Sequence, residues 1–77
     1  MKNTTLNKLR PGQAGRVVAV GGQGILKRRL IDMGITPGIS VLVRKVAPLG
    51  DPIEINLRGY ELSIRKDDAK NITVEPN

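Results

Sequence analysis

The sequence contains neither cysteine nor histidine, and Tyr60 is its only aromatic residue. Without cysteine there is no disulfide and no thiolate ligand, and without histidine there is neither imidazole catalysis nor an imidazole metal site. Proteins that stack the bases of single-stranded nucleic acids use several aromatic side chains, which this chain lacks. These absences favour functions that need a surface rather than a reactive side chain.

Long apolar runs are absent as well. No stretch approaches the roughly 18 apolar residues that indicate a membrane-spanning helix, and residues 1–10 lack the apolar core of a signal peptide, so we expect a cytoplasmic protein. With 77 residues the chain is expected to form a single domain, spanning residues 1–77. A domain of this size has little core to spare for a sequestered pocket, so the sequence predicts a protein that is not an enzyme.

Positive charge is in excess, because 13 Lys and Arg against 7 Asp and Glu give a net charge of +6. Such a balance favours an acidic partner, whether nucleic acid, an anionic membrane face or an acidic protein, although it also serves solubility alone. The acidic residues are scattered, and the adjacent pair Asp67-Asp68 would point apart. The sequence therefore predicts no metal site, no cofactor and no catalytic residue.

The clearest helical pattern is carried by Leu26, Leu30 and Met33, which recur at positions i, i+4 and i+7. Gly34 follows this stripe, where a glycine ends a helix in the left-handed conformation at least cost. Pro37 then prevents the helix from resuming. The pattern predicts a short amphipathic helix that ends at a sharp connector.

The densest basic cluster of the chain lies off this stripe. We define the basic helix face as Lys27, Arg28, Arg29 and Ile31. In one interpretation it is simply the solvated side of the helix, with Arg28 partly paired to Asp32 four residues later. In the other, arginines beside an exposed isoleucine form a contact patch for an acidic partner. We take the basic helix face as the predicted partner-binding site.

The rest of the chain is dominated by β-branched and alternating apolar residues, which predict about five short strands. The strands are expected over residues 15–20, 39–46, 53–57, 60–65 and 72–74. The nearly continuous apolar run at 39–46 predicts that both faces of this strand are partly buried. Ile53, Ile55 and Leu57 alternate with polar residues and predict a half-buried strand, and Tyr60, Leu62 and Ile64 alternate in the same way in the return strand. Arg58-Gly59 predicts a two-residue hairpin turn. A helix inserted after the first strand completes a mainly β, closed or nearly closed barrel.

Three further segments carry local expectations. Thr5 is expected to cap one turn anchored by Leu6 and Leu9. Residues 47–52 form a loop long enough to project as a tip, and residues 66–70 form a short polar turn. Gly12-x-x-Gly15 before a β-branched strand is similar to the RNA-binding motif of small ribosomal barrels. An RNA-binding barrel of ribosomal type is therefore the alternative function.

As a whole, the chain resembles the FeoA family, the small cytosolic component of bacterial ferrous-iron uptake. The most specific match is Leu30-x-x-Met33-Gly34-x-x-Pro37-Gly38. The remaining matches are Leu6, Leu9, Gly12 and Gly15, then Arg29-Leu30-Ile31-Asp32, Gly50-Asp51-Pro52-Ile53, Gly59-Tyr60-Glu61-Leu62-Ser63-Ile64-Arg65 and Ile72-Thr73-Val74. They run in order over nearly the full length. The resemblance implies an SH3-like barrel with a helical insertion.

The same resemblance implies a function. FeoA proteins are thought to assist FeoB, a membrane transporter whose cytosolic part carries a GTP-binding domain, and the family is sometimes labelled as transition-metal binding. We therefore expect a non-enzymatic adaptor that modulates FeoB by protein–protein contact at the inner face of the membrane. Its basic helix would allow peripheral contact with the membrane face, and its short barrel edges would allow self-association.

Overall fold

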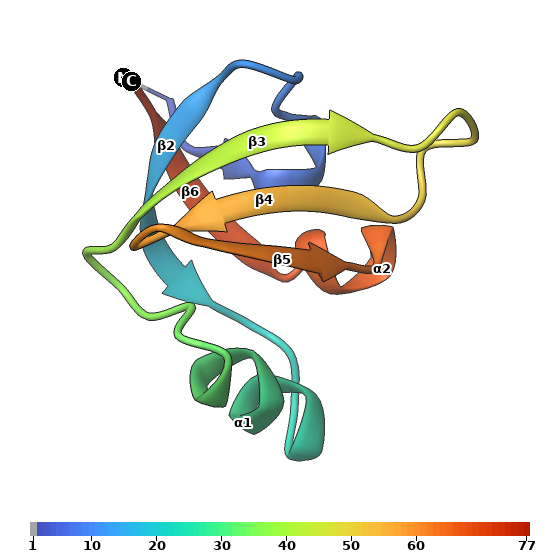
Figure 1. Cartoon of the computed structure of the whole chain (residues 1–77). Helices are drawn as coiled ribbons and strands as arrows, with labels where there is room; N and C mark the ends of the chain where they lie inside the picture. The colour runs from blue at the N-terminus through green and yellow to red at the C-terminus, as the bar shows by residue number, and fades with distance from the viewer. Residues whose placement is uncertain (1) are drawn as a thin grey trace.

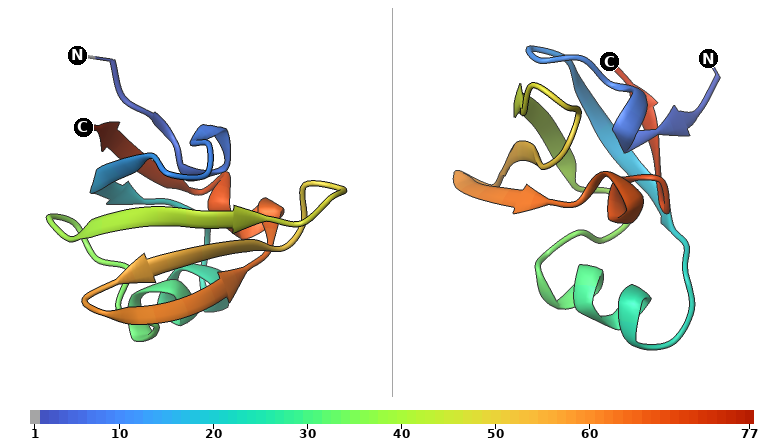
Figure 2. Two further views of the ribbon diagram at one scale, coloured as in Figure 1. Left: turned by 45° about the horizontal axis from the view of Figure 1, so that its top comes forward. Right: turned by 90° about the vertical axis from the view of Figure 1, so that its right-hand side faces the viewer.

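A computed structural model describes residues 2–77 of the chain. One antiparallel sheet of six strands in the order β1-β6-β2-β3-β4-β5 makes up most of it. The elements are β1 (Thr4–Thr5), the 3-10 turn η1 (Leu6–Lys8), β2 (Ala14–Val20), α1 (Ile25–Asp32), β3 (Ser40–Val46), β4 (Ile53–Leu57), β5 (Tyr60–Ile64), α2 (Lys66–Ala69) and β6 (Ile72–Pro76). The sheet curls so that β3, β4 and β5 face β1, β2 and β6 across the core, and α1 hangs from one end (Figures 1 and 2).

Alternation along the strands fills the space inside the curl. In β4 the side chains of Ile53, Ile55 and Leu57 are buried while the residues between them are half-buried. No charged or polar side chain is buried in the part of the chain that the structure describes. The core consists of Leu6, Leu9, Val17, Val20, Leu30, Ile35, Ile39, Val41, Val43, Ile53, Ile55, Leu57, Ile64, Ala69, Ile72 and Val74. It is a continuous apolar cluster.

Two irregularities of register help the sheet to curl. The pairing of β2 with β6 shifts between Val17 and Ala19, and the pairing of β3 with β4 shifts between Val43 and Lys45. Each shift leaves one extra residue, Val18 or Arg44, and such bulges bend the strand and increase its twist. Both extra residues are exposed, with Val18 at 41%.

The mainly β architecture and the helical insertion predicted from the sequence are confirmed, with six strands in place of about five. The additional strand, β1, is only two residues long, and Thr4 pairs with Val74. Two polar residues have no periodicity that would predict a strand. Among the described residues, hydrogen bonds do not join β1 to β5, so the curled sheet keeps two edges.

Burial along two strands can be compared with the predictions. The strand at 39–46, expected to be partly buried on both faces, has Val41 and Val43 buried on one face and Leu42 half-buried on the other, where Ser40 is exposed. Tyr60 shares the alternation of Leu62 and Ile64, yet it is 66% exposed. Burial along β5 falls from Ile64 towards Tyr60, because this end of the strand runs off the core towards the hairpin turn.

The predictions for the hairpin turn, the Thr5 cap and residues 66–70 had different outcomes. The Arg58-Gly59 hairpin turn is confirmed, with φ values of +52° and +82°. Thr5 occupies the N-cap position of η1, but its hydroxyl bonds to the Asn7 side chain instead of a backbone N–H. Residues 66–69 form helix α2 and not only a turn. Its N-terminus is held by a carboxylate distant in sequence, since the Lys66 N–H donates to Asp51 Oδ1 at 3.0 Å.

Candidate partner-binding surface

Helix α1 is attached to the sheet through the predicted stripe. Leu30 is fully buried, and Leu26 and Met33 pack half-buried against the core. Beyond the helix, the Gly34 N–H donates to Ile31 O at 2.9 Å and the Ile35 N–H donates to Leu30 O at 3.1 Å. With φ of +98° at Gly34, this is a Schellman stop sealed by the apolar pair of Leu30 and Ile35. The predicted glycine stop is confirmed.

The opposite end of α1 has no cap. Gly24 occupies the N-cap position with φ of +55° and has no side chain that could accept from the free N–H groups. No acidic residue lies in the first turn, where Lys27 and Arg28 instead follow. Because the N-terminus of a helix carries partial positive charge, these cations add to a charge that an anion would offset.

Three residues of the basic helix face share a shallow concave surface. We define the outer groove by its lining residues, Gly24, Lys27, Arg28, Ile31 and Asp32. Their spacing of three or four residues places them on one side of the helix, away from the buried stripe. Ile31 is 39% exposed within the groove, and the neighbouring Ile25 is 82% exposed. Apolar surface between two cations is thus open to a partner.

Arg29, the fourth residue of the basic helix face, lies elsewhere. Its Nη2 is 3.6 Å from Asp68 Oδ2 on α2, and the Asp68 side chain is only 14% exposed. Arg28 and Asp32, expected to pair, form no ion pair within 4.0 Å in residues 2–77. The structure therefore brings Lys27, Arg28 and Ile31 together and ties Arg29 to the barrel.

Sequence reasoning did not single out Gly24 or Asp32 as parts of this surface. Their positions eight residues apart, with Lys27, Arg28 and Ile31 between them, follow the i, i+3, i+4, i+7, i+8 repeat of one helix face. Applying that repeat to the polar side of α1 would have found both. It would also have left Arg29 out, because position 29 falls outside the repeat.

The glycines of the RNA-binding alternative have structural roles. Gly12 has a φ of +91° in the turn before β2. A Cβ atom on Gly15 would lie 3.1 Å from Glu75 O, so the backbones of β2 and β6 approach closely there. Turn geometry and strand packing account for both residues of Gly12-x-x-Gly15.

Residues 2–77 contain neither a cluster of metal ligands nor a membrane-spanning helix. No three His, Cys, Asp or Glu side chains gather closely enough to hold a metal ion. No helix in this part of the chain is both long and apolar enough to cross a bilayer.

Comparison with solved structures places the architecture in a class. FeoA from Stenotrophomonas maltophilia, solved with zinc and described as a procaryotic SH3 domain protein, superposes with a TM-score of 0.83 at 24% identity, covering 94% of this chain and 89% of that one. The curled sheet with one helical insertion therefore defines a small SH3-like barrel, as expected. The FeoA domain family matches residues 4–76, and the chain belongs to this family.

Two relatives have higher identity. An FeoA-like protein from Clostridium acetobutylicum is 39% identical, with a TM-score of 0.89 over 97% of this chain and 87% of that one. A fusion of Fe(2+) transport protein A and the Fe(2+) transporter FeoB from Porphyromonas gingivalis is 36% identical over 70 residues. That match covers 91% of this chain but only 8% of the fusion protein. Family membership links the chain to ferrous iron transport.

Proposed function

We propose that the chain is a non-enzymatic adaptor of ferrous-iron uptake that modulates the FeoB transporter by binding its cytosolic part through the outer groove. The adaptor works at the inner face of the membrane while it is bound. The observation that carries this proposal is the uncapped, cationic N-terminal half of α1, together with exposed isoleucine. Membership of the FeoA family supports a role in ferrous-iron uptake, and the relative that is fused to FeoB supports FeoB as the partner.

The outer groove predicts the chemistry of the surface that FeoB would present. Lys27 and Arg28 have no carboxylate within 4.0 Å among residues 2–77, so both remain available for an acidic partner. A carboxylate there would also accept from the free N–H groups beside Gly24, and it would offset the helix dipole. Ile31 offers apolar contact between the cations. We therefore infer an acidic segment with at least one apolar side chain.

Arg29 is expected to contribute less to binding than the sequence suggested. Its guanidinium already lies beside the Asp68 carboxylate, so a partner would have to compete with an existing pair. The binding residues of the proposal are accordingly Lys27, Arg28 and Ile31, with Arg29 in a supporting position between α1 and α2.

The experiment compares two double charge reversals that change the net charge equally. Lys27→Glu/Arg28→Glu alters the outer groove, whereas Arg10→Glu/Lys45→Glu alters exposed cations of the barrel; each takes the net charge from +6 to +2. Binding to the isolated cytosolic part of FeoB is measured by biolayer interferometry. We expect the groove variant to bind at least about tenfold more weakly than wild type, as for loss of two charged contacts.

The control variant separates the groove from the total charge. Arg10→Glu/Lys45→Glu should keep most of the affinity and lose mainly association rate. Equal losses for the two variants would mean that only the net charge matters, and equal retention would remove the outer groove from the interface. Ile31→Ala is expected to weaken binding without altering its salt dependence, because it removes apolar contact only.

A further inference from the structure

Strand β5 is an edge strand of the sheet. It is the last strand in the order and, among the elements of residues 2–77, pairs with β4 alone. Five consecutive residue pairs, from Leu57 opposite Tyr60 to Ile53 opposite Ile64, run without a shift of register. This regularity contrasts with the shifted pairings of β2 with β6 and of β3 with β4. Figure 1 shows β5 as the outermost strand on the side of α1.

The hairpin turn fixes which backbone groups face outwards. Positive φ at both Arg58 and Gly59 is the geometry of a type I′ turn, which makes its flanking residues a hydrogen-bonded pair. Hydrogen-bonded and non-hydrogen-bonded pairs then alternate along the hairpin. Tyr60, Leu62 and Ile64 bond to β4, so the N–H and C=O groups of Glu61 and Ser63 point to the open edge. Within residues 2–77, no other backbone or side-chain group bonds to them.

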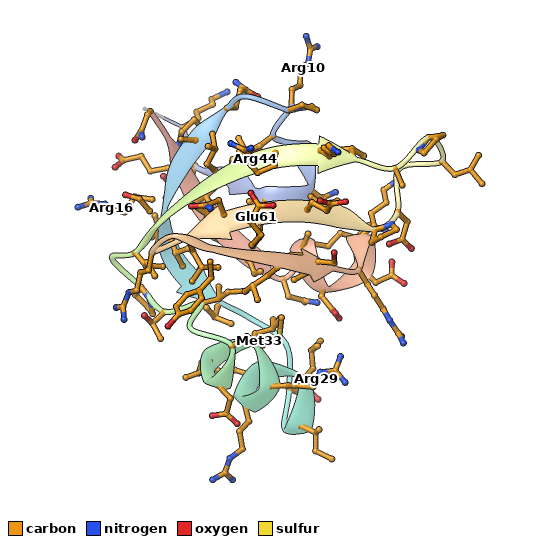
Figure 3. The ribbon with its side chains drawn as sticks, viewed as in Figure 1. Arg10, Arg16, Arg29, Met33, Arg44 and Glu61 are labelled. Carbon is orange, nitrogen blue, oxygen red and sulfur yellow. The ribbon has the colours of Figure 1, made fainter. Side chains whose placement is uncertain are left out.

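The usual protections of an edge strand are missing from β5. It contains no proline and no bulge, and its only charged side chain is Glu61. That carboxylate lies 3.2 Å from Nε of Arg44, the bulge residue of β3, on the outer face of the sheet (Figure 3). The charge is therefore turned away from the edge and partly neutralised. The opposite edge, β1, is protected by its length of two residues.

We infer that β5 pairs with β5 of a second copy of this chain, antiparallel and about a two-fold axis at Leu62. In this register Glu61 and Ser63 of one copy exchange hydrogen bonds with Ser63 and Glu61 of the other, which joins the outward groups found above. Leu62 then faces Leu62 of the second copy. Tyr60 then lies opposite Ile64 of the second copy, whose own side chain stays in its core at 3% exposure.

Self-complementarity is the reason for choosing a second copy over a foreign peptide. Within β5 the proposed register contains no pair of like charges, and it places Tyr60, which the monomer leaves 66% exposed, at the contact between the two strands. A two-fold contact uses the same patch on both copies, so each favourable residue pair away from the axis occurs twice. A contact of one strand edge is smaller than a standard interface, so the dimer is weak and depends on concentration.

Salt distinguishes this contact from the one proposed with FeoB. Each copy carries a net charge of +6, so two copies repel and salt screens the repulsion. Dimerisation should therefore strengthen between about 50 mM and about 500 mM NaCl, whereas binding of the basic helix face to an acidic partner should weaken. The dimer uses no residue of α1, so Lys27→Glu/Arg28→Glu should dimerise at least as well as wild type.

The test is sedimentation equilibrium of the full chain over a concentration series at both salt levels. Ser63→Pro removes an N–H that faces the open edge and is not needed by β4, and the matched variant Ser63→Ala keeps it. We expect wild type and Ser63→Ala to form the same weak dimer. Because two hydrogen bonds are lost per dimer, Ser63→Pro should raise the dissociation constant at least about tenfold.

A second variant covers the case in which the proline disturbs the hairpin, which far-UV circular dichroism would reveal. Tyr60→Lys changes an exposed side chain at the edge of the dimer contact and places a charge opposite Ile64 of the second copy. It should likewise weaken the dimer at least about tenfold. A chain that stays monomeric throughout the series, or a dimer that both folded variants leave unchanged, would overturn the inference.

Discussion

The barrel and helix α1 bury their side chains to very different extents. In β4, three of five residues are buried and the other two are half-buried. Of the eight residues of α1, Leu30 alone is buried. The helix is joined to the barrel by its apolar stripe, the glycine stop and the pair of Arg29 with Asp68. This contrast teaches that the barrel carries the stability while α1 is free to carry charge.

Removing core volume from each region tests this division most strongly. Ile55→Ala in β4 is expected to lower the free energy of unfolding by about 2–5 kcal/mol, because the residue is fully buried. Leu30→Ala deletes an equally buried side chain, but its cost should be smaller, since α1 can separate locally while the barrel stays folded. Denaturant unfolding followed by circular dichroism measures both. Equal losses would show that α1 is as tightly integrated as β4.

A second comparison concerns the glycines at the two ends of the connector after α1. Gly34→Ala places a Cβ 3.2 Å from Leu57 Cδ1 at a φ of +98°, whereas the Cβ of Gly38→Ala, at a φ of +95°, has no neighbour within 4 Å among residues 2–77. In both variants, backbone strain should lower the free energy of unfolding by about 1–2 kcal/mol. The excess loss for Gly34→Ala in thermal unfolding therefore measures how closely the end of α1 packs on β4. No excess would mean that Leu57 simply moves aside.

The smallest expected effect separates the two sides of α1. Arg29→Gln should lower the free energy of unfolding by less than about 1 kcal/mol, because its ion pair at 3.6 Å leaves the Arg29 side chain 56% exposed. Lys27→Gln, which removes a cation of the outer groove, should leave stability unchanged. Unfolding curves at low and high salt provide the measurement, and the difference between the variants should shrink as salt rises. A cost above 2 kcal/mol for Arg29→Gln would make the pair a main attachment of the helix.

Features set by neighbouring residues could be predicted from the sequence. The alternation of Ile53, Ile55 and Leu57 predicts a strand because side chains alternate between the two faces of a sheet. The stripe that ends at Gly34 predicts both the helix and its stop, since only one residue type adopts that backbone conformation cheaply. The Arg58-Gly59 turn follows from the two strands on either side of it.

Features set by distant residues could not be predicted in this way. Asp51 accepts a hydrogen bond from the Lys66 N–H at the start of α2, although the two residues are far apart in the sequence. Asp68 pairs with Arg29, whereas the predicted local pair of Arg28 with Asp32 does not form within residues 2–77. Tyr60 fits the alternating pattern, but where the strand leaves the core depends on the curl of the whole sheet. The predicted binding residues all lie on one helix, but only the structure shows that Lys27 and Arg28 line the outer groove while Arg29 lies beside Asp68.

The pairing of Thr4 with Val74 has a consequence for how this domain is joined to other polypeptides. It places β1 and the end of β6 side by side at one corner of the molecule (Figures 1 and 2). A polypeptide that continued beyond both strands would enter and leave on the same side of the domain. A host protein could then carry the barrel as an insertion in a surface loop, and its own segments on either side of the insertion could stay close together.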